Sequence, residues 1–353
     1  MAPKNATPHN NQKLSELKNL VINYSTQKHK TLLLPLDHDR HTWHKDFKYI
    51  NPASWSNPQQ IPYVAATALV DAYSQLPSRP DLAFNSLWSA SNNSYNDLFL
   101  SNHSSPGSSI SDSKSIEYSV QRISQQLHQH IPLNNGQLSL SIIDTIKEYI
   151  KQAPDKNLNF VASYILKGIS VESHNADPNN SQNKVREILI PSSYKTLKKK
   201  FPTLHNKIAT STGKKYSAIC AISETTCKTD IDFGIPKIKG PDARKLVHAT
   251  GKIIRQEVLQ FNSASASTGS VFDDEKHWLS FLILSFLYAT RNTAAHGNAA
   301  TRLNSIFSNG ESVTSSSWTF LFGYCYLSLI LLCQKKIFAP DLPPIYYNSQ
   351  IVL

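Results

Sequence analysis

Apolar residues recur at spacings of three and four along most of the chain, which is the pattern of amphipathic helices. In the segment 81–99, this spacing places Phe84, Leu87, Trp88, Ser91 and Tyr95 on one stripe. Strand patterns are few, and the best candidates are at 187–190 and around 219–222. The sequence therefore predicts a mostly α fold, with helices over 12–27, 64–76, 81–99, 116–130, 138–151, 156–168, 242–261, 274–306 and 316–337.

Irregular segments separate these helices. Residues 31–63 carry four prolines, and the serine-rich segment 101–115 is a flexible connection. Residues 171–183 form another loop, and Pro236, Gly240 and Pro241 mark a break before a helix that begins at Asp242. The first of these segments also holds His38, Asp39, His41, His44 and Asp46, which we interpret as a polar, aromatic-rich surface loop because they lack a recognised metal-ligand spacing.

Composition narrows the class of partner. With 353 residues, 40% of them apolar, the chain can build two domains or one long helical domain with inserts. The excess of 36 Lys and Arg over 25 Asp and Glu gives a net charge of +11. This balance favours an anionic partner, either nucleic acid or an acidic membrane surface.

The membrane is the less favoured of these two partners. No charged residue occurs from Ser312 to Gln334, but the strongly apolar part is only Phe320 to Cys333. A membrane span needs roughly 20 apolar residues, so the segment indicates a buried core helix. Because the N-terminus has no apolar segment typical of a secretory signal, we expect a cytoplasmic protein with no membrane partner.

A basic stretch is the first feature that points to RNA. There is no Asp or Glu from Ile188 to Ser223, and rings are interleaved at Tyr194, Phe201, His205 and Tyr216. We expect a phosphate-contacting surface with rings available for stacking. Its candidate RNA-binding residues are Lys195, Lys198, Lys199, Lys200, Lys207, Lys214 and Lys215.

A strongly apolar helix leads into the second feature, the run Arg291-Asn292-Thr293-Ala294-Ala295-His296-Gly297-Asn298. This run resembles the Arg-x(4 to 6)-His signature of the HEPN superfamily, including the polar residue directly after the arginine. The run Ala83-Phe84, Leu87-Trp88, Ala90, Asn92 and Tyr95 is similar to the Phe-x-x-Leu-Trp-x-Ala-x-Asn pattern of the first helix in some HEPN families. The resemblance implies a HEPN-like helical bundle over 80–337 with a basic insert at 184–240. An irregular N-terminal region, 1–79, precedes the bundle and a tail, 338–353, follows it.

The residues themselves are suited to RNA cleavage without a metal. Histidine, with an ordinary pKa of about 6.5, is suited to move the proton of the 2′-hydroxyl, and arginine is suited to hold the phosphate. We therefore expect Arg291 and His296 to be catalytic, giving a 2′,3′-cyclic phosphate and a 5′-hydroxyl. Asn292, four residues before His296, shares a helix face with it and is expected to orient the imidazole. Asn298 and Arg302 fall near Arg291 on a helix and are candidate phosphate contacts.

Positions 291 and 296 lie about 140° apart on a helix, so one copy presents the two groups imperfectly. The resemblance implies a symmetric homodimer or a larger complex in which two motifs meet, and a role in toxin–antitoxin or antiviral defence. An antitoxin or another regulatory partner is then expected. Some HEPN toxins have a tyrosine two residues after the histidine as the target of a partner nucleotidyltransferase, whereas this chain has Asn298.

Two alternatives stay open. The protein can be a non-catalytic RNA-binding subunit of a ribonucleoprotein complex, or Arg291 can pair with a helix end while His296 packs in a polar patch. No cofactor is expected, because the chain has no glycine-rich phosphate loop and no dinucleotide-binding motif. No metal site is expected either, because the four cysteines form no Cys-x-x-Cys pair.

Overall fold

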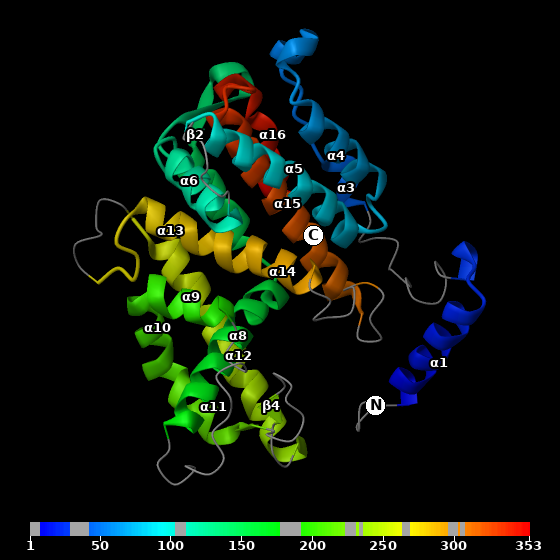
Figure 1. The fold of residues 1–353 in the computed structure, drawn as a ribbon, viewed down its shortest axis with the longest axis vertical. Coiled ribbons are helices and arrows are strands. Elements are labelled where there is room, and N and C mark those ends of the chain that lie inside the picture. The colour runs from blue at the N-terminus through cyan, green and yellow to red at the C-terminus, as the bar shows by residue number, and fades with distance from the viewer. Residues whose placement is uncertain are drawn as a thin grey trace. The chain divides into compact units, whose positions relative to one another are not determined.

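The structure is a computed structural model, and the predicted mostly α fold class is confirmed (Figure 1). It describes residues 8–28, 42–102, 111–176, 192–222, 231–232, 236–262, 269–295, 303 and 308–353. By packing, the chain divides into two compact units. Unit 1 comprises Met1–Pro154 and Thr290–Leu353, and unit 2 comprises Asp155–Ala289.

Unit 1 is a helical bundle with one small antiparallel hairpin. Its α-helices are α1 (Pro8–Ile22), α3 (Trp43–Asp46), α4 (Tyr63–Ser74), α5 (Pro80–Leu100), α6 (Asp112–Ser124), α7 (Ile142–Lys151), α15 (Gly310–Cys333) and α16 (Pro343–Ser349). Helix α14 (Ala289–Ala295) also belongs to unit 1, apart from its first residue. The strands are β1 (His130–Leu133) and β2 (Leu138–Ser141), and the short 3₁₀ helices are η2 (Ala53–Ser56), η3 (Pro58–Gln60), η4 (Asn134–Gly136) and η10 (Ala339–Asp341).

Helix α15 is the centre of unit 1 and packs along α5, with α6 and α16 also against it (Figure 1). It is long and apolar enough to cross a membrane, yet 89% of its most apolar 18-residue window is buried in the protein. This packing is that of a core helix, as its sequence predicts. At Gly323, an added Cβ would lie 3.0 Å from the ring of Phe84, so glycine allows α15 and α5 to approach closely.

Both ends of the expected bundle pack inside unit 1. Helix α4 packs on α5, and α16 packs on α7 and α15. Residues on either side of the expected boundaries at 79/80 and 337/338 therefore belong to one packed body.

The proline-rich segment before α4 lies largely on the surface where the structure describes it, and two buried rings anchor it. Trp43 and Phe47 are buried, and the ring of Phe47 contacts Tyr324 of α15 edge-on at 5.0 Å. The backbone N–H of Ile50 donates to the Tyr324 hydroxyl at 2.8 Å. The described part is therefore a surface segment, as expected, whose buried rings hold its backbone against the bundle. Its first part, with His38, Asp39 and His41, lies outside the described residues.

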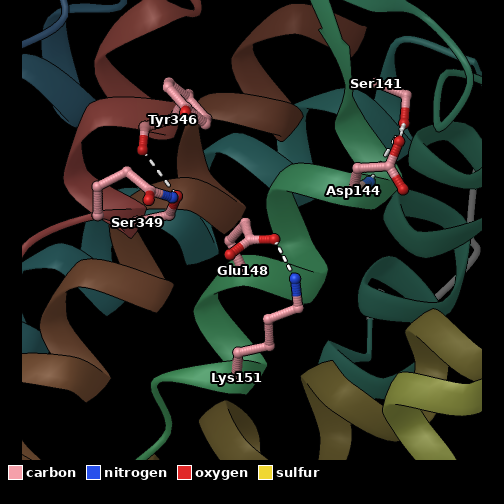
Figure 2. A network of polar contacts seen from close by, with 7 residues as sticks. Ser141, Asp144, Glu148, Lys151, Tyr346 and Ser349 are labelled. Atoms are coloured by element: carbon pink, nitrogen blue, oxygen red, sulfur yellow. Dashed lines mark hydrogen bonds and ion pairs between the residues drawn. The ribbon is translucent and has the colours of Figure 1, made fainter.

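A hairpin and a capped helix replace the single helix expected over 138–151. Strands β1 and β2 pair with Ile131 opposite Leu140, and Asn134 and Gly136 adopt positive φ in the turn. Helix α7 begins directly after β2, where the Ser141 hydroxyl accepts from the backbone N–H of Asp144 at 3.2 Å. Figure 2 shows this cap, the Glu148–Lys151 ion pair near the end of the same helix and the Tyr346–Ser349 contact of α16.

Unit 2 is also helical. Its elements are α8 (Asp155–Asn175), α9 (Ser192–Lys200), α10 (Pro202–Ile208), the π-helical turn η7 (Ala209–Gly213), α11 (Lys214–Ile219), β3 (Ala221–Ile222), β4 (Ile231–Asp232), α12 (Pro236–Gln260), α13 (Glu275–Leu282) and the π-helical segment η9 (Ile283–Tyr288).

Helices α8 and α12 form the spine of unit 2, with α11 packed against both. The turn η7 also contacts α12, and there the buried hydroxyls of Thr212 and Thr250 lie 2.9 Å apart. The break expected at Gly240 and Pro241 is wrong, because α12 begins at Pro236 and holds Pro241 inside it. Pro241 is the sixth residue of α12, so its missing N–H removes one helical hydrogen bond, to the carbonyl of Lys237, and the helix continues past it.

The two strand candidates have different outcomes. Residues 221–222 form β3, which pairs with β4 in an antiparallel sheet, whereas 187–190 lie outside the described residues. The expected loop at 171–183 begins later than predicted, since α8 continues to Asn175.

Candidate functional site

Helix α5 has two contrasting faces. The predicted stripe from Phe84 to Tyr95 is confirmed as its core face, and the Trp88 ring stacks on Tyr326 of α15 at 6.1 Å. A neighbouring face, about 120° around the helix from this stripe, carries polar, uncharged side chains. It carries Asn85, Ser89, Asn92, Asn93 and Asn96 at helical spacing.

Arg291 lies on α14, on the unit 1 side of the unit boundary. One guanidinium N–H donates from Nη1 to Oδ1 of Asn292 at 2.9 Å. The other terminal nitrogen, Nη2, lies 3.8 Å from Oδ2 of Asp112, the first residue of α6. Arg291 and Asp112 keep 29% and 32% of their side-chain surface exposed, so solvent weakens this long ion pair.

A chain of polar contacts joins α5 to α14 through Asp112. Asn96 donates from Nδ2 to Oδ1 of Asn92 at 2.7 Å, and Asn92 donates from Nδ2 to Oδ1 of Asp112 at 3.4 Å. Asp112 thus receives an amide on one oxygen and faces the Arg291 guanidinium on the other. Three segments that are distant in sequence converge on this one carboxylate.

Asn92, Asn96 and Arg291 line a cavity of about 600 Å³ in unit 1. Its lining residues are Asn85, Trp88, Ser89, Asn92, Asn93, Asn96 and Arg291. The wall therefore combines one cation with several neutral groups that both donate and accept hydrogen bonds. Such a surface is suited to a ligand that carries one anionic group beside a polar, planar one.

Of the predicted catalytic residues, the structure describes two. Arg291 lines the cavity, and Asn292 holds the Arg291 guanidinium through its amide oxygen. His296, Asn298 and Arg302 lie outside the described residues, so their roles stay predictions. His296 follows Arg291 by five residues, a separation that even an extended chain limits to about 18 Å.

We missed Asp112 and most of the amide face from the sequence. The spacing of Asn85, Ser89, Asn92 and Asn96 is itself a signal, because it places polar groups of one kind on one helix face. Asp112 gives no such signal. It lies at the end of the serine-rich segment, and only packing brings it to Arg291.

The lysines of the basic stretch are confined to unit 2, mostly on α9 and α11. All seven lie on helices, and every one except the half-buried Lys200 is exposed. Among the described residues, Lys198 forms an ion pair with Glu172 at 2.8 Å, and Lys207 forms one with the buried Glu257 at 2.6 Å.

The rings of the basic stretch are not available for stacking, contrary to our expectation. Tyr194, Phe201, His205 and Tyr216 are all buried. Tyr194 donates to Glu172 at 2.5 Å, and its oxygen lies 3.0 Å from Nε2 of His205. Burial raises the pKa of the Tyr194 hydroxyl and lowers the pKa of His205. The rings repeat at helical spacing and form the inner face of the helices whose outer face carries the lysines.

A comparison with known proteins finds no matching family model, no matching curated protein and no matching solved structure. Within the described part of the chain, no three His, Cys, Asp or Glu side chains gather as metal ligands.

Proposed function

We propose that this protein is a HEPN-like endoribonuclease that cleaves RNA without a metal ion. The observation that carries the proposal is the cavity of unit 1, where Arg291 and Asn92 both contribute to the wall. These residues belong to the two segments whose sequences resemble HEPN motifs. Their meeting in one cavity supports the resemblance, because sequence separation alone gives no reason for α5 and α14 to share a site.

The proposed reaction needs two groups. His296 takes the proton of the 2′-hydroxyl, whose oxygen attacks the adjacent phosphorus, and the bond to the 5′-oxygen of the next nucleotide breaks. The leaving oxygen takes a proton from solvent water and His296 returns its proton to solvent, which gives a 2′,3′-cyclic phosphate and a 5′-hydroxyl. Arg291 stabilises the charge on the phosphate, and its contact with Asn292 fixes the guanidinium in the cavity wall.

The decisive experiment incubates the purified full-length protein with mixed RNAs and EDTA, and then examines the product ends. We expect cleavage to continue in EDTA, with cyclic phosphate and 5′-hydroxyl ends. His296→Ala should abolish cleavage while the circular dichroism spectrum stays unchanged. The matched control is His130→Ala, which removes an exposed histidine of β1. Undiminished cleavage by His296→Ala contradicts the assignment, and loss of cleavage in EDTA contradicts the metal-independent reaction.

A second candidate function is a non-catalytic RNA-binding subunit of a ribonucleoprotein complex. The exposed lysines of unit 2 favour it, since they need no cleavage chemistry to contact phosphates. This candidate expects RNA binding that weakens when Lys198, Lys199 and Lys200 are changed together and that is indifferent to His296. RNA binding without any cleavage by the unaltered protein would favour it over the nuclease.

The proposal extends to assembly and biological role. We expect a homodimer or a larger complex in which two Arg–His motifs form a composite site, because a five-residue separation on an ideal helix would direct the two groups about 140° apart. Light scattering during size-exclusion chromatography measures this mass. A cytoplasmic toxin or antiviral nuclease, restrained by an antitoxin or another regulatory partner, is the role that we propose.

A further inference from the structure

The polar face of α5 is made from poor helix formers. Four asparagines of this 21-residue helix line the cavity. Each costs the helix roughly 0.5–0.7 kcal/mol relative to alanine, and lysine or glutamate would keep the face soluble at less cost. A local choice that opposes the secondary structure is typical of a functional surface.

These amides keep hydrogen-bonding capacity that the fold does not use. Asn92 uses one N–H on Asp112 and one lone pair on Asn96, which leaves it a second N–H and a second lone pair. The amides of Asn85 and Asn93 are exposed and make no side-chain hydrogen bond within the described part of the chain. The cavity wall therefore offers paired donors and acceptors, which is the arrangement that recognises the edge of a nucleobase.

We propose that the cavity is a base-binding subsite that selects adenine beside the phosphate held by Arg291. An amide binds adenine with two hydrogen bonds, because a ring nitrogen that accepts lies next to the amino group that donates. Adenine presents this pair on both of its edges. Asp112 is not part of the lining, but it contacts Asn92 and Arg291 of the lining, so its carboxylate places an acceptor beside the cavity that favours an amino group and disfavours the two carbonyl oxygens of uracil.

The position of Asp112 links the two parts of such a ligand. Its carboxylate contacts Asn92 on one side and Arg291 on the other, so only one carboxylate group separates the base-reading amide from the phosphate-binding cation. A nucleotide spans this arrangement, with its base on α5 and its phosphate on α14. Binding of adenine does not depend on the proposed function. Only one consequence rests on it, namely that the protein cleaves RNA after adenosine.

The test measures binding of nucleoside 3′-monophosphates to the full-length protein by isothermal titration calorimetry. The probes are the 3′-monophosphates of adenosine, cytidine, guanosine and uridine, together with adenosine and inorganic phosphate alone. We expect adenosine 3′-monophosphate to bind about tenfold more tightly than the guanosine and uridine nucleotides, and more tightly than cytidine 3′-monophosphate, whose base presents an amino group beside a ring nitrogen on one edge only. It should also bind more tightly than adenosine or phosphate.

Two kinds of variant separate the two halves of the site. Asn92→Ala should remove the preference for adenine but keep phosphate binding. Arg291→Ala should lower the affinity for adenosine 3′-monophosphate to that for adenosine. The double change Asn85→Ala with Asn93→Ala alters only exposed amides, so it tests the preference without a folding defect. Asn102→Ala, just beyond α5 and outside the cavity, is the matched control.

Equal binding of the four nucleotides overturns the inference, as does a preference that survives both amide variants. Preference for another base overturns the assignment to adenine. RNA cleavage by the unaltered protein is mapped in parallel, which separates this inference from the proposed function. Adenine preference without cleavage leaves the subsite standing and removes the nuclease, whereas cleavage without base preference does the reverse.

Discussion

The cavity of unit 1 differs from α9, α10 and α11 of unit 2, here called the lysine helices, in how its polar residues are arranged. In the cavity, neutral amides and one arginine from distant segments converge, and Asp112 contacts both kinds of group. On α9, α10 and α11, the lysines project outward from amphipathic helices whose rings form the core. Convergence creates a shaped site with directional contacts, whereas an outward face supplies charge without selecting a ligand's shape.

The largest expected effect comes from the cavity. Arg291→Ala removes the one cation that the described residues contribute to its lining, and we expect RNA cleavage to fall by about a hundredfold or more, as for the loss of one transition-state donor. Initial cleavage rates on a defined RNA measure this. Arg244→Ala, an exposed arginine of α12, should leave the rate unchanged. Equal losses in both variants would mean that general charge, not the cavity, drives the reaction.

The buried side of the lysine helices is tested by Gly168→Ala in α8. An added Cβ would lie 2.1 Å from the Tyr194 ring, so we expect the free energy of unfolding to fall by about 1–3 kcal/mol. Urea denaturation measures it. Gly240→Ala in α12 is the matched control, because its Cβ meets nothing within 4 Å and should stabilise the helix slightly. A Gly168→Ala protein as stable as this control would show that Tyr194 does not pack on α8.

The exposed lysines on the outer side of the lysine helices should bind RNA with an affinity that falls as the salt concentration rises. Lys199, Lys214 and Lys215 are exposed and form no ion pair within the described residues. Changing all three to glutamine should lower the slope of log affinity against log salt by about 2 for single-stranded RNA, because three phosphate contacts are lost. The control changes Lys18, Lys45 and Lys48 of unit 1 to glutamine. These lysines are also exposed, so the control loses the same total charge. Identical slopes in the two triple variants would make the lysine helices an ordinary solvated surface.

The smallest expected effect is a pH dependence of stability from His205. Burial lowers its pKa below the ordinary 6.5, so the unfolded chain binds the proton more readily than the folded one. The stability that this neutral imidazole contributes is present above about pH 6.5 and is lost as the pH falls through the lowered pKa. Urea unfolding at several pH values should show a weaker decline for His205→Gln, which cannot be protonated. An unchanged decline would mean that His205 is not buried against Tyr194.

The linear pattern of apolar and polar residues was enough to predict the helical class, the core face of α5 and the burial of α15. Each of these is a local property, because helical periodicity decides which side of a helix faces the core. The same periodicity also explains the buried rings at 194, 201, 205 and 216, which we misinterpreted as a stacking surface.

Periodicity says nothing about which helices meet. Arg291 could be chosen from its motif, but its neighbours Asp112 and Asn92 lie about half the chain away, and only packing of α5, α6 and α14 assembles them. The hairpin before α7 likewise depends on pairing between strands, which a one-dimensional pattern of four residues specifies weakly. The local sequence motif was therefore enough to select Arg291 as a candidate, whereas long-range packing determined which residues form the cavity wall around it.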